Sequence, residues 1–105
     1  MIKAIRVKGC SFHKEGFEGL ESGKTYEALL KSEPTNEHDP NAVAVYIKEK
    51  QVGYLPAGWW GQEKDVSLFL HSMIDSENPL SAQITGGFLL DDGQKANYGG
   101  LLYLV

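Results

Sequence analysis

Apolar residues fall in short runs along this chain, and most runs alternate with polar residues as half-buried strands do. Residues 42–47 differ because they are almost wholly apolar, which predicts a strand in the middle of a sheet. Residues 25–31 also have helical propensity, but Thr25 and Tyr26 favour extended structure and Pro34 follows closely. We therefore expect strands over residues 2–9, 25–31, 42–47, 51–55, 80–85 and 98–105.

One segment has the period of a helix. Five apolar residues recur at intervals of three and four positions, as on one face of an α-helix: Val66, Phe69, Leu70, Met73 and Ile74. We expect this helix to start near Gln62 and to stop before Asn78 and Pro79.

Glycines and polar clusters mark the connections between these elements. Residues 9–23 predict a loop that Phe17 and Leu20 anchor to the core. Residues 48–50 predict the turn of a hairpin, and Gly86-Gly87 favours a bulge or a bend.

These elements predict a mainly β fold, namely a small OB-like or SH3-like β-barrel of about six strands with one or two helices. Closing a sheet into a barrel removes exposed strand edges, which suits a chain of many short strands. The chain contains no internal repeat, low-complexity tract or linker, so we expect residues 1–105 to form a single domain.

Composition constrains the location of the protein. Hydrophobic residues make up 42% of the chain, and no apolar run approaches the roughly 20 residues that span a bilayer. The N-terminal residues alternate between charged and apolar side chains, unlike a signal peptide. Cys10 is the only cysteine, which excludes an internal disulfide and suits a reducing compartment. We expect a cytoplasmic protein with no membrane partner.

Charge is unevenly distributed along the chain. Residues 1–50 hold eight Lys or Arg and eight Asp or Glu, whereas residues 51–105 hold two and six. A net charge of −4 argues against a protein that grips long duplex DNA through many phosphates. A small site that holds only a strand end is compatible with this charge.

The densest candidate chemistry lies in the polar loop between residues 33 and 42. Binding residues tend to lie on loops held by a rigid scaffold, which makes this loop a candidate ligand-binding edge. Asp39, Pro40 and Asn41 also fit simple turn chemistry, although a turn requires neither Asn36 nor His38. Five hydrogen-bonding side chains occur within six positions: Asn36, Glu37, His38, Asp39 and Asn41.

Cys10 and His13 have the spacing of half a zinc site, and with His38 and Asp39 they offer the groups of a Cys-His-Asp catalytic arrangement. No second cysteine-rich half follows, and no local signature of such an enzyme or of a P-loop is present. We expect Cys10 to be a small buried residue at a strand end. We therefore expect no metal, no cofactor and no enzymatic activity.

Aromatic residues form a further set of candidates. Phe12 and His13 follow the first strand and Tyr54 ends the hairpin, where they fit either a core or a surface that stacks on unpaired bases. Trp59 and Trp60 cannot both point inward from a regular element. We expect the pair to cover one end of the barrel, with one of the two exposed at a contact.

Three of these motifs, in this order, resemble the HIRAN domain family. They are Val7-Lys-Gly-Cys-Ser-Phe-His13, the strand and polar loop over residues 29–45, and Gln51-Val-Gly-Tyr-Leu-Pro56. The resemblance covers roughly residues 5–75, and Asp-Pro-Asn-Ala-Val-Ala-Val and Val-Gly-Tyr-Leu-Pro are its most specific parts. The chain looks like a stand-alone HIRAN domain, which implies an OB-like barrel with helical additions.

The resemblance also implies a site. In fork-remodelling ATPases of eukaryotes, such a domain binds the free 3′ end of single-stranded DNA. Its pocket uses two neighbouring aromatic residues and a polar loop whose aspartate accepts a hydrogen bond from the terminal 3′-hydroxyl. By position these roles fall on Phe12 and His13, on Asn36, His38 and Asp39, and on Tyr54 as a further pocket residue.

This chain departs from the DNA-binding members of the family at several positions. Ser11 replaces a basic residue, His13 replaces a larger aromatic residue, and Pro40 and Pro56 stand where lysine can occur. Fewer cations predict weak affinity and a shallow salt dependence. The hydrolase activity of related proteins belongs to fused ATPase domains, so a helicase or nuclease would be a partner in trans.

The sequence thus predicts a non-enzymatic module that recognises the 3′-hydroxyl end of single-stranded DNA in DNA repair or processing. The alternative is a protein-interaction adaptor barrel that does not bind DNA. The acidic balance and the Trp59-Trp60 pair favour that alternative.

Overall fold

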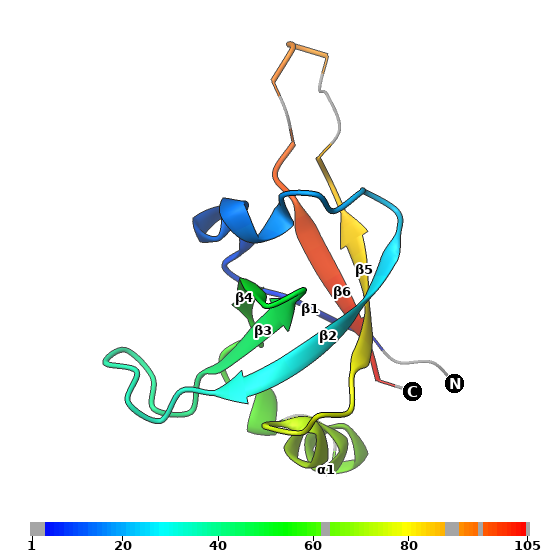
Figure 1. Ribbon diagram of the computed structural model, residues 1–105. Helices are drawn as coiled ribbons and strands as arrows, with labels where there is room; N and C mark the ends of the chain where they lie inside the picture. Colours follow the sequence, from blue (N-terminus) through cyan, green and yellow to red (C-terminus); the bar gives the residue numbers. More distant parts are fainter. Residues whose placement is uncertain (1–3, 62–63, 88–90, 95, 105) are drawn as a thin grey trace.

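The computed structural model describes residues 4–61, 64–87, 91–94 and 96–104. Within these residues, antiparallel strands form one curled sheet in the order β1-β6-β5-β2-β3-β4 (Figure 1). The mainly β class predicted from the sequence is confirmed, and the described residues form six strands and one α-helix. The strands are β1 (Ala4–Arg6), β2 (Thr25–Ser32), β3 (Val43–Ile47), β4 (Lys50–Tyr54), β5 (Leu80–Thr85) and β6 (Gly99–Tyr103). The helices are the 3-10 helices η1 (Cys10–Phe12), η2 (Lys14–Phe17) and η3 (Trp59–Gly61), and the α-helix α1 (Lys64–Met73).

The two edges of the curled sheet meet just after β1. Lys8 and Tyr54 form an antiparallel bridge in which each backbone N–H donates to the other residue's carbonyl oxygen at 2.8 Å. Gly53 permits this approach, because a Cβ there would collide with the carbonyl oxygen of Lys8 and the side chain of Val7. The sheet is therefore a curled half-barrel whose edges are bridged next to Tyr54.

The core lies inside the curl of the sheet. In β5 the alternating residues Leu80, Ala82 and Ile84 are buried, as the period of two predicted. Strand β3 lies between β2 and β4, and four of its five residues are buried, so its predicted central position is confirmed.

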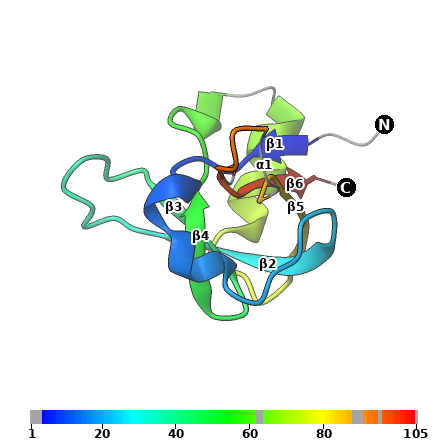
Figure 2. The same ribbon diagram turned by 90° about the horizontal axis from the view of Figure 1, so that it is seen from above.

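Helix α1 covers one end of the half-barrel (Figures 1 and 2). Leu70 on its apolar face is fully buried. The helix ends at Met73, earlier than the apolar pattern indicates, because Ile74 pairs with Leu30 of β2. The predicted start near Gln62 lies outside the described residues.

The segment after β1 contains the 3-10 helices η1 and η2, where the sequence predicted only a loop. Phe17 and Leu20 are buried, so their predicted anchoring role is confirmed. Gly16 allows η2 to contact β4, since a Cβ there would collide with the carbonyl oxygen of Gln51 (Figure 2 shows the segment in blue).

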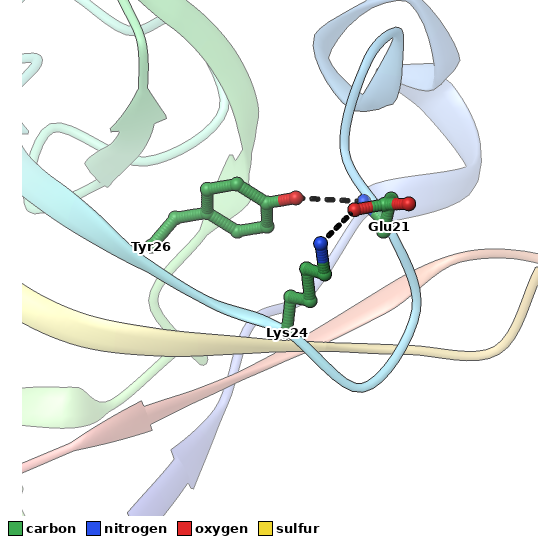
Figure 3. A network of polar contacts seen from close by, with 3 residues as sticks. All are labelled: Glu21, Lys24 and Tyr26. Atoms are coloured by element: carbon green, nitrogen blue, oxygen red, sulfur yellow. Dashed lines mark hydrogen bonds and ion pairs between the residues drawn. The ribbon is translucent and has the colours of Figure 1, made fainter.

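A polar cluster holds the turn that leads into β2 (Figure 3). The hydroxyl of Tyr26 accepts a hydrogen bond from the backbone N–H of Glu21 at 2.9 Å, and Lys24 forms an ion pair with Glu21. The hydrogen bond from Lys24, and then its charge, lower the pKa of Glu21. Both charged side chains are exposed, so the ion pair contributes little to stability.

The remaining turns follow the predicted pattern with shifted boundaries. Lys48 and Glu49 alone make the β3–β4 turn, both at positive φ, and Lys50 already belongs to β4. Gly86 and Gly87 both lie at positive φ directly after β5, and the β5–β6 pairing has no register shift. Among the described residues, no helix is long and apolar enough to cross a bilayer.

Candidate functional site

The loop between β2 and β3 projects from the sheet, as the left side of Figure 1 shows. Between this loop and the segment that follows β4 lies a hollow of about 280 Å³, which we name the loop hollow. The structure thus brings four of the six predicted site residues together, three from this loop and Tyr54 from β4. The polar residues lining it are Asn36, His38, Asp39 and Tyr54, and its apolar wall includes Leu55, Pro56 and Trp59.

Asn36 organises the loop through its side-chain amide. Its Oδ1 accepts hydrogen bonds from the backbone N–H groups of His38 at 2.9 Å and Asp39 at 3.0 Å. The expectation that a turn does not require Asn36 is therefore wrong, because this oxygen is consumed in building the turn. His38 fits the expectation, since its side chain is exposed and is not among the hydrogen-bonding groups of the described residues.

Asp39 is held rigidly at the wall of the loop hollow. Its Oδ1 accepts from the backbone N–H of Asn41 at 2.9 Å, and its carbonyl oxygen accepts from the N–H of Ala42 at 3.0 Å. Among the described residues, no hydrogen-bond donor reaches its Oδ2. The carboxylate is therefore fixed in place and keeps one oxygen with which to accept from a ligand.

Glu33 connects the loop to β4, a role that the sequence did not reveal. Its Oε1 accepts from Asn36 Nδ2 at 3.0 Å and from the Tyr54 hydroxyl at 2.9 Å. Tyr54 lies 21 positions away in the sequence, so no local pattern could have identified the pair. The one local signal for this role is that Glu33 stands directly before Pro34, at the start of the polar loop.

Tyr54 is a neutral donor at neutral pH. A hydrogen bond with Gln51 lowers its pKa, but burial and the nearby Glu33 carboxylate outweigh this effect and leave the pKa raised. Its ring also packs edge-on against His13, with ring centroids 5.7 Å apart. Through this contact the loop hollow adjoins a second hollow.

The second hollow, of about 600 Å³, is lined by Phe12, His13, Lys14 and Lys50 among other residues, and we name it the aromatic hollow. Phe12 projects into solvent with 87% of its surface exposed, whereas His13 is half-buried against Tyr54. The two predicted stacking residues thus lie in different environments. Phe12 has the accessible ring, and His13 joins the two hollows.

Trp59 lines the loop hollow and connects its apolar wall to the polar loop. Its indole N–H donates to the carbonyl oxygen of Asn41 at 2.9 Å, and its ring packs against His71 with centroids 4.7 Å apart. Trp59 is buried and Trp60 is 44% exposed, which confirms that one of the pair is buried and the other exposed. The hydrogen bond to the loop spans 18 positions and has no local signal in the sequence.

Cys10 is buried, as expected, and its thiol contacts the carbonyl oxygen of Val7 at 3.6 Å. Burial raises the pKa of Cys10, although backbone hydrogen bonds oppose the change, so little reactive thiolate forms at neutral pH. The described residues contain no group of three or more His, Cys, Asp or Glu side chains able to hold a metal ion. The observed environment therefore gives no support to a Cys-His-Asp nucleophile.

Two solved structures resemble this chain at low sequence identity. A search of curated proteins found no match. Among solved structures, a protein from Lactobacillus plantarum is similar, with 18% identity, a TM-score of 0.47 and 98% of each chain covered. The HIRAN domain of human HLTF is similar with 17% identity and a TM-score of 0.42, over 97% of this chain and 74% of that chain.

The family comparison covers most of the fold. Residues 4–78 match the HIRAN domain, a range that extends from β1 through the polar loop, β4 and α1. This range contains every residue that lines the loop hollow. Because more than half of the sequence matches, the chain belongs to the HIRAN domain family.

Proposed function

We propose that this protein binds single-stranded DNA at a free 3′-hydroxyl end, which enters the loop hollow. HIRAN domains are known generally as nucleic-acid-binding modules. The observation that carries the more specific proposal is the fixed Asp39 carboxylate, which lines the hollow and keeps one oxygen free of donors among the described residues. A hollow of about 280 Å³ is near the lower limit of ligand pockets and suits one terminal residue of a strand.

The chemistry of Asp39 favours a terminal hydroxyl over other strand ends. A carboxylate accepts a short, strong hydrogen bond from a hydroxyl group. The same carboxylate repels a 3′-phosphate or the phosphate of a continuing strand, which gives selectivity by excluding the wrong ligand. The exposed ring of Phe12 offers a face on which a neighbouring base stacks.

The biological role that fits such a site is delivery of a strand end during DNA repair or processing. The protein would hold the end, and a helicase or nuclease acting in trans would carry out the reaction. The described residues supply neither a reactive thiolate nor a metal cluster with which to cleave DNA themselves.

The test compares two oligonucleotides of about ten residues, one ending in a 3′-hydroxyl and the other in a 3′-phosphate, by fluorescence anisotropy. Wild-type protein should bind the hydroxyl form more tightly. Asp39→Asn should weaken that binding about tenfold, because it replaces a charged acceptor, whose hydrogen bond is worth about 1.5–3 kcal/mol, by a neutral one, whose bond is worth about 0.5–1.5 kcal/mol. It should also remove most of the discrimination against the phosphate form. Asp65→Asn, in the exposed first turn of α1, is the matched control and should bind as wild type does.

The outcomes separate the possible functions. Equal affinity of wild-type protein for both ends would show a general single-strand binder and reject end recognition. If Asp39→Asn kept full discrimination, another group would be responsible for it. Absence of binding to either oligonucleotide would reject the proposal and favour the second candidate.

That second candidate is a protein-interaction module, which the exposed apolar side chains favour. Trp60 is 44% exposed and Leu68 of α1 is 57% exposed. The hydroxyl of Ser67, next to Leu68, donates to the carbonyl oxygen of Trp60 at 3.1 Å, so these residues belong to adjoining segments. A partner whose binding is lost in Trp60→Ala and kept in Asp39→Asn would support this function.

A further inference from the structure

The Glu33 carboxylate occupies hydrogen-bond donors that an incoming DNA phosphate would need. Its Oε1 accepts from the Tyr54 hydroxyl at 2.9 Å and from Asn36 Nδ2 at 3.0 Å, so donors from two separate elements converge on one anionic oxygen. A phosphate oxygen is also an anionic acceptor, and phenol and amide groups are common donors to phosphate. The carboxylate thus imitates the charge and the acceptor chemistry of a bound phosphate.

The hydrogen bond between Tyr54 and Glu33 affects DNA binding directly. A phenol carries a single proton, so its hydroxyl cannot donate to a strand while it donates to Glu33. An amide NH₂ has two protons, so Asn36 keeps a second one for another acceptor. The hydroxyl of Tyr54 is therefore the donor that strand binding must release.

The negative charge at the loop hollow also opposes the binding of a phosphate. Among the described residues, its lining contains Asp39 but no lysine or arginine, and half-buried Glu33 adds a second negative charge beside it. A phosphate that approaches Tyr54 meets this carboxylate, and like charges that face each other oppose binding.

We propose that Glu33 is an internal phosphate mimic that lowers the affinity of the site for strand ends. This inference rests on the proposed function and assigns a negative regulatory role to a residue within that site. In the free protein Glu33 pairs with Tyr54 and Asn36, and the strand binds by displacing it from Tyr54.

The test is Glu33→Gln, measured by anisotropy with the 3′-hydroxyl oligonucleotide. Glutamine keeps a carbonyl acceptor for Tyr54 and Asn36 but removes the charge, so affinity should rise about threefold to tenfold. Glu37→Gln is the matched control, because Glu37 lies in the same loop, is exposed and is not an acceptor in the Tyr54 and Asn36 contacts. This control should change affinity less than about twofold.

A double-mutant cycle with Tyr54→Phe tests the mechanism separately. Removal of the hydroxyl should cost more affinity in the Glu33→Gln background, where that hydroxyl is easily released to the strand, than in the wild-type background. Equal costs would reject the displacement mechanism. Thermal melting of each variant shows whether the fold persists.

The failure of this inference is distinguishable from failure of the proposed function. If wild-type protein binds the 3′-hydroxyl end and Glu33→Gln binds no more tightly, the phosphate-mimic role is wrong and the function stands. If neither protein binds, both proposals fall. Binding by Glu33→Gln alone would contradict the proposed function of the wild-type protein but would support the inhibitory role of Glu33.

Discussion

At the scale of single residues, some side-chain atoms of the polar loop hold the backbone in place and others are left to contact a ligand. Asn36 Oδ1 and Asp39 Oδ1 are consumed in holding the backbone, whereas Asp39 Oδ2 meets no donor among the described residues. Phe12 stands apart from this network because its ring is exposed and builds nothing in the core. Its contribution to ligand binding is therefore separable from its contribution to folding.

Phe12→Ala tests that separation. If the ring stacks on a base, the substitution should weaken binding of single-stranded DNA by about 1–3 kcal/mol, measured by anisotropy. The melting temperature should stay nearly unchanged, because 87% of the surface of this residue is already in solvent. Leu68→Ala, which also removes an exposed apolar side chain, is the control and should leave affinity unaltered. Equal losses in the two variants would argue against stacking.

At the scale of elements, periodic segments were predictable and segments fixed by distant partners were not. The alternation in β5 and the apolar run in β3 identify those strands correctly, because each pattern reports burial directly. Burial patterns do not predict the end of α1 or the helices η1 and η2. One depends on the pairing of Ile74 with Leu30, and the others are short turns with no repeating pattern.

The same distinction applies to the site. Four of the six residues that family resemblance assigned to the site line the loop hollow. Glu33 and Trp59, whose hydrogen bonds hold this site together, were not assigned. Both are held by contacts that cross the fold, so only the assembled half-barrel reveals them. The binding roles of the assigned residues remain predictions.

The bridge between the sheet edges gives a prediction at this scale. Gly53→Ala should destabilise the protein by about 1–3 kcal/mol, because the added methyl group collides with the Lys8 backbone and forces the edges apart. Urea denaturation measures the loss. Gly61→Ala is the control, since a Cβ at Gly61 meets nothing within 4 Å, and it should change stability by less than about 0.5 kcal/mol. A similar stability for both variants would show that the bridge is dispensable.

At the scale of the whole molecule, the two hollows and the charge distribution limit how much of a strand the protein can hold. In the part of the chain that the structure describes, no lysine or arginine lines the loop hollow. The aromatic hollow has Lys14 and Lys50, but Glu15 and Glu18 line it too, and Lys50 lies 3.6 Å from Glu18. Within the two hollows, few of the described cations are therefore available to neutralise DNA phosphates, although the hollows adjoin at His13 and Tyr54.

This balance predicts a shallow dependence of DNA affinity on salt. Each phosphate neutralised on a single strand contributes about −0.7 to the slope of log K against log salt, so one or two contacts give a slope between about −0.7 and −1.4. Anisotropy titrations between about 50 and 200 mM salt measure it. Lys14→Gln should reduce the slope by about 0.7 if the strand continues into the aromatic hollow, and Lys64→Gln in the exposed first turn of α1 should not. A slope steeper than about −3 would mean that the strand follows a longer path across the protein than the two hollows provide.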